Sequence, residues 1–287
     1  MRGTQSLLHI CVACWKRPNL LGWELLWRWA FGLPAAAILY HQAMRIAGHG
    51  NLSGLSLNDP LQAGQQLAIA AAAIKPDVER LIAWLGPLLA VAWAIASGLG
   101  RSAVLQRIDP RMHPAPFTLI VLQLLRMAAL VTVWLGWYCA LLWAANATLS
   151  SATPNLVGWS AWVICLSLGI FVLWALLSWI FSIAPLLAML EGRGVFPSLA
   201  SSLRLGVLRS KLIEVNLVLG IVRLALIVLA MVFSAIPLPF TADMTGTPLY
   251  LWWALVTLLY LLASDFLQVA RLAAFVEFWR LYHPEKN

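Results

Sequence analysis

Charged residues are scarce in this sequence. They make up 10% of its 287 residues, and 62% are hydrophobic, whereas soluble domains carry roughly 25% charged and 45–50% apolar residues. Because much of any folded surface must face water, a soluble core of this size could not bury so much apolar surface. The scarcity of charge therefore excludes a soluble globular domain and predicts a protein whose solvent is lipid. The 16 tryptophans agree, because Trp concentrates where hydrocarbon meets lipid headgroups.

Signatures of catalysis and metal binding are also missing. The five histidines are scattered without the paired spacing of zinc enzymes, and neither a G-x-S-x-G elbow nor a phosphate-binding P-loop occurs. Cys11 and Cys14 form a lone C-x-x-C, but a zinc site needs four ligands. Cys139 and Cys165 fall in apolar runs, where Cys acts as a small hydrophobe. We therefore predict no catalytic residue, no metal ligand and no cofactor site.

Long apolar runs are what the sequence has in abundance. A membrane-spanning helix needs ~20 predominantly apolar residues, and six runs of this kind occur. Because no Gly/Ser-rich linker or charged tail separates them, we expect one all-α transmembrane bundle of about six spans over 1–287. The expected spans are 23–43, 81–100, 117–148, 156–190, 212–235 and 248–272, with the last helix continuing on the cytoplasmic side to 282.

The basic residues are distributed unevenly among the loops. The net charge is +8, yet loops 149–155 and 236–247 contain no Lys or Arg, and most basic residues fall in the segments that would face the opposite side. Because Lys and Arg accumulate in cytoplasmic loops, both termini are predicted to be cytoplasmic, in a multi-pass protein of the cell inner membrane. The same basic face would contact anionic headgroups of membrane lipids. A nucleic-acid partner is disfavoured because no continuous basic arm occurs.

Two further segments are predicted to be amphipathic helices at the membrane interface. Segment 59–74 begins with Asn-Asp-Pro, a sequence typical of a helix start, and helical spacing gathers its apolar residues on one face. Segment 195–209 places Phe196, Leu199 and Leu203 on one face and several serines on another. Contact with lipid and packing on the bundle are equally good interpretations of both segments.

Polar side chains inside the spans form the candidate site, because such groups are costly in lipid and usually face the bundle interior. Helical spacing puts Asn216 and Arg223 on one face of the fifth span. The same spacing puts Asp265, Gln268 and Arg271 in one sector of the sixth. Because consecutive spans are antiparallel neighbours, we predict an ion pair between Arg223 and Asp265, with Asn216 or Gln268 beside it.

Two interpretations of this polar set stay open. In the first, it is a buried network that holds two helices in register, although such hydrogen bonds contribute only ~0.6 kcal/mol on average. In the second, it is a cationic cavity that binds a phosphate or a carboxylate. The complete candidate set is Arg126, Asn216, Arg223, Asp265, Gln268 and Arg271.

The segment after the fourth span carries a further pattern. Residues 183–194 read IAPLLAMLEGRG and are followed by Pro-Ser-Leu and Ser-Leu-Arg-Leu. This pattern resembles that of bacterial six-helix integral membrane proteins, including the membrane domain that precedes some glycerophosphodiester phosphodiesterases. The matching residues are Glu191, Ser198, Leu199, Ser202 and Leu205. The resemblance implies a fold and a membrane location, and it implies no hydrolysis, because these residues include no phosphodiesterase domain.

Three functional hypotheses follow, in order of preference. The lack of a catalytic set and the basic cytoplasmic face favour a non-enzymatic protein that binds lipid or belongs to an envelope assembly with protein partners. The alternative is a small transporter or permease subunit that binds an anionic substrate at Arg126, Arg223 and Arg271. The third is a membrane-embedded enzyme that acts on lipid headgroups.

Overall fold

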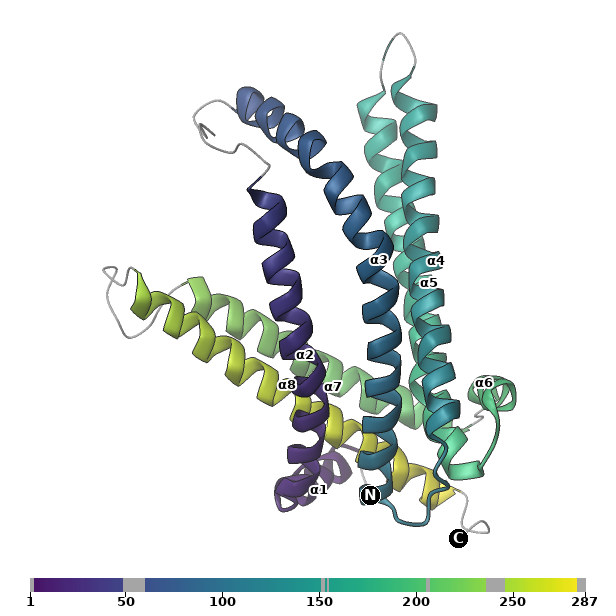
Figure 1. Cartoon of the computed structure of the whole chain (residues 1–287). Coiled ribbons are helices and arrows are strands. Elements are labelled where there is room, and N and C mark those ends of the chain that lie inside the picture. The colour runs from purple at the N-terminus through teal and green to yellow at the C-terminus, as the bar shows by residue number, and fades with distance from the viewer. Residues whose placement is uncertain are drawn as a thin grey trace.

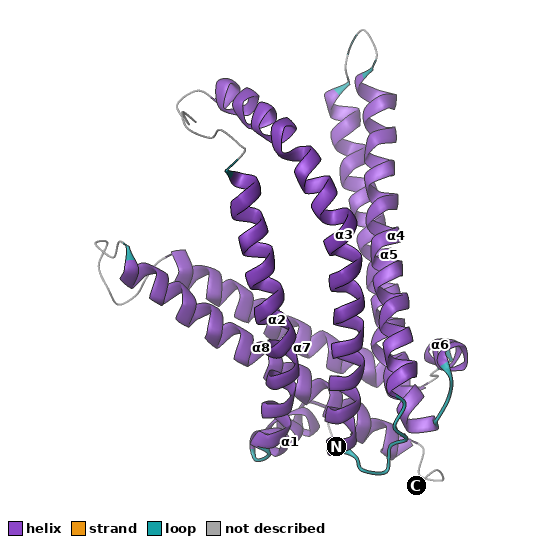
Figure 2. Ribbon diagram, in the orientation of Figure 1, coloured by secondary structure: helices purple, strands orange, loops and turns teal. Residues whose placement is uncertain are grey.

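The fold was analysed in a computed structural model of the whole chain. It describes residues 3–48, 60–150, 153, 155–204, 207–235 and 246–282. Within these ranges the chain forms helices joined by short loops, without strands (Figure 2). The helices are α1 (Gly3–Trp15), α2 (Pro18–Ala47), α3 (Pro60–Ile108), α4 (Pro116–Leu149), α5 (Leu156–Glu191), α6 (Val195–Leu203), α7 (Val207–Ala235) and α8 (Thr247–Tyr282). The predicted all-α fold is confirmed.

Local sequence signals explain where several helices begin and end. Pro18 and Pro116 stand at the first turns of α2 and α4. Backbone N–H groups in a first turn have no intrahelical acceptor, so a proline there costs no hydrogen bond. Asn155 begins α5, and its side chain accepts a hydrogen bond of 2.8 Å from the Gly158 backbone N–H. Gly192 ends α5 with φ 62°, a left-handed conformation that a residue without Cβ adopts at little cost.

Five helices are long and apolar enough to cross a membrane, so the chain is a multi-pass membrane protein. They are Ile69–Ile108, Pro116–Leu149, Leu156–Glu191, Leu212–Ala235 and Thr247–Leu281. The predicted span 23–43 lies inside α2, which has 30 residues but is not among the five. Glu24, Arg28 and several tryptophans interrupt its apolar residues and lower its hydropathy. The structure also extends the last span without a break to Tyr282, as the sequence predicted.

The helices form three neighbouring pairs (Figure 1). α2 lies along α3, and α4 and α5 form a long antiparallel hairpin that also contacts α3. α7 and α8 form a second hairpin that crosses the others obliquely, and α8 contacts both α1 and α2. α1, α6 and the C-terminal end of α8 lie at one end of the molecule, which we call the basic end.

The hydrophobic core is concentrated toward the basic end. Leu105, Ile183, Leu187 and Phe275 are among its fully buried side chains, contributed by α3, α5 and α8. Toward the other end, large apolar side chains face outward, and Phe171 of α5 is 69% exposed. Exposed apolar surface on this scale is expected where lipid rather than water is the solvent.

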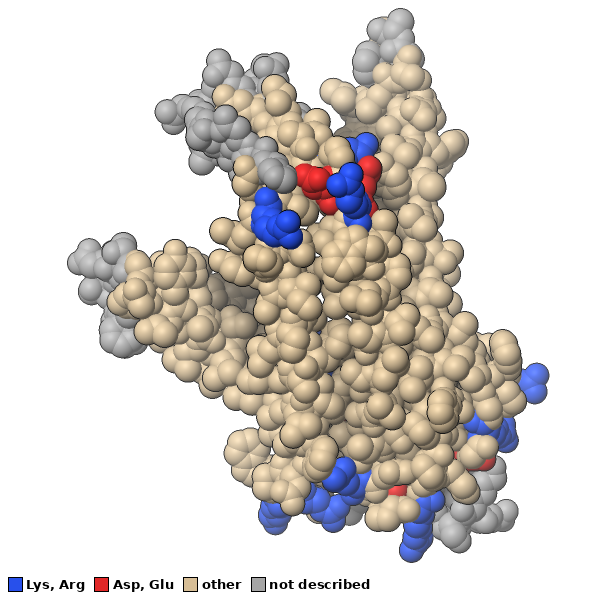
Figure 3. All heavy atoms as spheres, viewed as in Figure 1, with Lys and Arg blue, Asp and Glu red and all other residues tan. Residues whose placement is uncertain are grey.

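Charged side chains gather at two levels of the surface (Figure 3). One level is the basic end, where Lys16, Arg111, Arg193 and Arg204 are exposed. The other lies over the upper parts of α2 and α3, where Lys75 forms an exposed ion pair with Glu79 across 3.7 Å. The surface between the two levels shows no charge in this view, which is the pattern expected of a band in contact with hydrocarbon.

Both predicted interfacial segments need correction. Segment 59–74 is not a separate short helix: from residue 60 it is the beginning of α3, which continues through Pro76 and Pro87 and bends along its length (Figure 1). Prolines in a long helix produce bends of this kind. Residue 59 lies outside the described residues, as does most of the loop 236–247.

Segment 195–209 does contain a short separate helix, α6, which ends at Leu203. Its serine side is turned inward, whereas an amphipathic helix on the core of a soluble protein turns its apolar side inward. Ser198 and Ser202 are buried, whereas Phe196 is 78% and Leu203 62% exposed. The Ser198 hydroxyl donates to the Gly194 carbonyl across 2.8 Å, which satisfies the buried group locally. Phe196 and Leu203 therefore face outward, which suits a helix in contact with lipid, whereas Leu199 is half-buried and packs against the core.

Two glycines allow α3 to approach its neighbours closely. A Cβ on Gly98 would lie 2.5 Å from the Ile120 Cγ1 atom and 2.9 Å from the Ile120 backbone nitrogen. A Cβ on Gly100 would lie 2.3 Å from the Trp27 ring. Small residues at such contacts are typical of helices packed in membranes. These glycines therefore set the spacing of α2, α3 and α4.

We predict that Gly98→Ala lowers the free energy of unfolding by about 1–3 kcal/mol, because the new methyl group collides with α4 backbone. The matched control is Gly136→Ala in α4, where a Cβ meets nothing within 4 Å; it should be neutral or slightly stabilising. Denaturant unfolding in mixed micelles measures both. Equal effects of the two substitutions would contradict the close contact.

Candidate functional site

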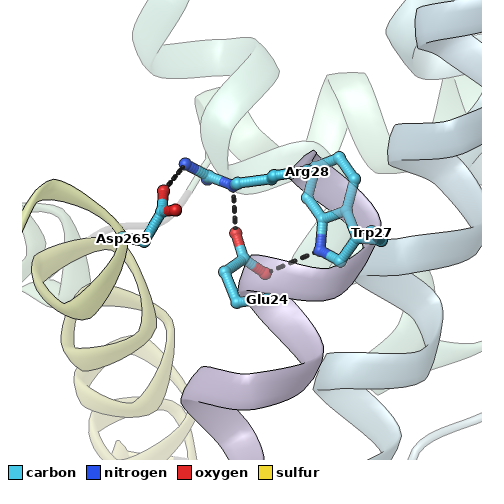
Figure 4. Close-up of polar contacts among 4 residues, drawn as sticks. All are labelled: Glu24, Trp27, Arg28 and Asp265. Atoms are coloured by element: carbon cyan, nitrogen blue, oxygen red, sulfur yellow. Dashed lines mark hydrogen bonds and ion pairs between the residues drawn. The ribbon is translucent and has the colours of Figure 1, made fainter. Parts of the chain in front are cut away.

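A three-residue ion network joins α2 to α8 (Figure 4). The Arg28 guanidinium contacts Glu24 on its own helix, with 2.6 Å between Nε and Oε1, and it also donates from Nη1 to the Asp265 carboxylate of α8. The Glu24 and Asp265 side chains are 1% and 6% exposed, and that of Arg28 is 23% exposed. One half-buried cation is thus shared by two buried carboxylates.

Trp27 completes this network and links it to α3. Its indole Nε1 donates to the Glu24 carboxylate across 2.9 Å. Its ring lies against Gly100 and is 5.5 Å from the ring of Trp93, between centroids. The hydrogen bond satisfies the second oxygen of a carboxylate that has almost no contact with solvent, as a buried polar group requires. Trp27 therefore fixes Glu24 in position and separates it from the outer side of the α2–α3 pair.

The predicted pair between Arg223 and Asp265 is wrong. Asp265 is buried as expected, but its partner is Arg28, and the Arg223 side chain of α7 is exposed. Asn216 and Gln268 are half-buried and do not join the network within the described part of the chain. The error lay in the choice of neighbour: α8 contacts α2 as well as α7, and its Asp265 face is turned to α2.

Three further arginines lie around this network. Arg101 of α3 is within electrostatic range of Glu24, Arg28, Arg126 and Arg271. Arg271 of α8 is in turn within range of Arg28, Arg126 and Glu24. The Nε groups of Arg101 and Arg271 are buried, and neither has a hydrogen-bond acceptor among the described residues. The group therefore brings together cations from four helices, α2, α3, α4 and α8.

The charges of this cluster do not balance. Four guanidinium groups face two carboxylates, and both carboxylates are within reach of Arg28. Because a guanidinium does not lose its proton in proteins, the cluster keeps a net charge of +2, and Arg101, Arg126 and Arg271 have no carboxylate partner in it. On insertion scales an uncompensated charge costs ~2.5–3.5 kcal/mol at the centre of a spanning helix, and these half-buried arginines lie within or beside apolar helices. The arrangement is therefore suited to holding an anion.

The structure assembles part of the predicted site and adds residues to it. Arg126, Asp265 and Arg271 fall in one cluster, whereas Arg223 contributes only long-range charge to Arg271. The members that were missed are Glu24, Arg28 and Arg101. For Glu24 and Arg28 the signal was present in the sequence, because an acid and a base one helical turn apart inside an apolar run form a self-paired unit; Arg101 has no such neighbour.

A second polar cleft lies at the basic end, between α1 and α8. It has a volume of about 260 Å³ and is lined by Cys14, Arg17, Glu277 and Arg280, among others. Arg280 donates from Nε to the buried Asp109 carboxylate across 3.0 Å, which joins the end of α8 to the loop after α3. This ion pair explains why the C-terminal part of α8 stays in place beyond the span.

The C-x-x-C pair lies beside this cleft, on α1. Cys14 is buried and Cys11 half-buried. Burial raises the pKa of both thiols, and for Cys14 the neighbouring Cys11 and Glu277 raise the pKa further, against a lowering by Arg17. Because the thiolate is the reactive form, a raised pKa makes both groups poor nucleophiles and poor metal ligands at neutral pH. Within the described residues no group of three or more metal-binding side chains occurs.

Comparisons of the chain with protein-family models, with curated protein sequences and with solved structures gave no match.

We predict that Asp265→Asn lowers the free energy of unfolding by ~3 kcal/mol, because removing one partner of a buried pair leaves the other uncompensated. The control Arg223→Gln removes an exposed cation and should change stability by less than ~0.5 kcal/mol. A double-mutant cycle of Arg28→Gln with Asp265→Asn should show a coupling of about 0.5–3 kcal/mol. Additive effects in this cycle, with coupling between positions 223 and 265 instead, would contradict the network.

Proposed function

We propose that this chain is a non-enzymatic integral membrane protein that binds the phosphate group of an anionic membrane lipid at Arg101, Arg126 and Arg271. The observation that carries the proposal is the excess of positive charge in the cluster, together with the buried Nε groups of Arg101 and Arg271 that lack an acceptor among the described residues. A phosphate offers several oxygen acceptors and matches the fork geometry of guanidinium groups. It would supply the missing negative charge without a further acidic side chain.

A lipid is the favoured source of this phosphate. Around the cluster the helices present apolar side chains rather than polar ones, and α4 and α5 expose them along most of their length. A lipid headgroup reaches such a site from the membrane, whereas a soluble anion would need a polar path from one side. The alternative is therefore a small transporter or permease subunit in which the same arginines bind a soluble anion, and it is separated by experiment below. Protein partners in a larger envelope assembly are compatible with both.

We further propose that α2 is a sixth span, with both termini on the cytoplasmic side of the cell inner membrane. α2 has 30 residues and lies along α3 (Figure 1), and the charges of Glu24 and Arg28 in its first half are neutralised within the bundle by each other and by Asp265. With six crossings the two ends of the chain fall on one side. Exposed basic residues gather at that end, in agreement with the enrichment of Lys and Arg in cytoplasmic segments.

Reporter fusions test this orientation. A fusion after residue 153, between α4 and α5, should be active only with a reporter that works outside the cytoplasm, and fusions after residues 48 and 246 should behave alike. Fusions in the loop at Arg111 and after residue 282 should be active only with a cytoplasmic reporter. A cytoplasmic signal at 153 would overturn the orientation, and an N-terminal tag found on the same side of the membrane as residue 48 would remove α2 from the spans.

Native mass spectrometry of the gently extracted protein tests the lipid site. The wild-type chain should retain an anionic phospholipid, and Arg101→Gln or Arg126→Gln should reduce its retention roughly tenfold, because each removes a charged hydrogen-bond donor. Arg101→Lys should restore part of it, since the charge remains. The control Arg223→Gln, at an exposed arginine, should retain lipid normally.

Two outcomes distinguish the alternatives. The proposal fails, and the cluster is structural, if two results occur together. Added inorganic phosphate or a soluble organic anion displaces no lipid, and the Arg101→Gln and Arg126→Gln variants retain as much lipid as the Arg223→Gln control. If no lipid is retained but soluble anions raise the unfolding temperature of the wild-type chain and not of the Arg101→Gln variant, the transporter alternative replaces it.

A further inference from the structure

A groove on the outer side of the α2–α3 pair is distinct from the arginine cluster. It has a volume of about 490 Å³ and is lined by Trp23, Leu26 and Trp27 of α2 and by Gly100 and Ala103 of α3, among others. Trp27 forms the wall between the two, since its ring faces Gly100 in the groove and its Nε1 bonds to Glu24 in the cluster. A ligand in the groove is therefore separate from one at the cluster.

The α3 side of the groove is made by one helical face of small residues. Ala96, Gly100 and Ala103 recur at helical spacing on this face, and Arg107 follows one turn later at the basic end. From Ala96 to Arg107 the helix rises ~16 Å, which is about half of a ~30 Å hydrocarbon core. The groove thus has the length of an acyl chain in one leaflet.

The end of the groove is marked by a fixed cation. The Arg107 guanidinium stacks over the Trp23 ring, with 3.9 Å from Cζ to the ring centroid. One of its N–H groups donates to the Ala103 carbonyl across 3.4 Å. No carboxylate forms an ion pair with Arg107 in the part of the chain that is described. Because a guanidinium has five donors, those that remain can bind a phosphate at the headgroup level.

From this geometry we infer a second lipid site, which rests on the proposed position of α2 in the bilayer but not on the lipid proposed at the arginine cluster. An anionic phospholipid of the leaflet at the basic end lies with one acyl chain in the α2–α3 groove and its phosphate on Arg107. The small residues of α3 leave space for the acyl chain, and the aromatic side chains of α2 pack on that acyl chain. The stacked guanidinium selects for a negatively charged headgroup. Charge selection is what distinguishes this site from ordinary contact with bulk lipid.

Photo-crosslinking in nanodiscs tests the site. The full chain is placed in phosphatidylcholine that contains a minor fraction of phosphatidylglycerol with a diazirine on its acyl chain, and crosslinked peptides are mapped. Crosslinks should fall on residues that line the groove, such as Leu26 and Leu99, several-fold above those of a diazirine phosphatidylcholine. Arg107→Gln should lower the phosphatidylglycerol yield roughly tenfold, and the control Arg111→Gln, an exposed arginine at the same end, should leave it unchanged.

A second variant blocks the groove by its volume and leaves the charge of the site unchanged. Ala103→Trp fills the groove and should abolish crosslinking of both lipids to it, whereas Ala254→Trp on an exposed face of α8 should not. Denaturant unfolding of the Ala103→Trp chain in mixed micelles, compared with that of the wild-type chain, reports that the variant is folded and keeps failure of the two sites apart. Equal crosslinking by the two lipids, an Arg111→Gln effect as large as that of Arg107→Gln, or crosslinks to a second copy of the chain would overturn the inference.

Discussion

The Arg28 guanidinium lies between two buried carboxylates, one on its own helix and one on α8, and the rest of the structure depends on how charge is compensated around it. A helix that carries an acid and a base in its apolar stretch enters lipid favourably only if these groups find partners. Glu24 and Asp265 supply them for α2. The neighbouring arginines have no carboxylate partner of their own, so the cluster around Arg28 keeps an excess of positive charge.

The same constraint explains why α8 contacts so many elements at the basic end. Asp265 receives Arg28 from α2, and Arg280 reaches the buried Asp109 beyond α3, so two ion pairs fix α8 against helices that come early in the chain. Close approach through Gly98 and Gly100 brings α3 against α4 and α2. Away from this end the α4–α5 and α7–α8 hairpins diverge (Figure 1), and their apolar side chains face lipid rather than one another. The basic end is the packed part of the fold, and the functional proposals concern groups located in or beside it.

The sequence predicted the bounds of three spanning helices, but it divided α3 into two helices and paired the charged side chains wrongly. Apolar length alone decides where a helix can cross a membrane, so the boundaries of α4, α5 and α8 were found within a few residues. In lipid, however, buried and exposed faces are both apolar, so periodicity does not report helix rotation. Asp265 was therefore assigned to Arg223 although its partner is Arg28, and the pattern of α6 left open whether its serine face or its apolar face is buried. Only the Glu24–Arg28 spacing carried usable pairing information.

The anion proposed at Arg101, Arg126 and Arg271 can be detected by a magnetic-resonance distance measurement. The protein is labelled with carbon-13 at the arginine guanidinium carbons and reconstituted in phosphatidylglycerol bilayers, and dephasing by lipid phosphorus-31 is recorded by solid-state NMR. Glutamine substitutions assign each signal. The account predicts strong dephasing at Arg101 and Arg126 and none at Arg28, which already has two carboxylates. Dephasing restricted to arginines exposed at the basic end would contradict it.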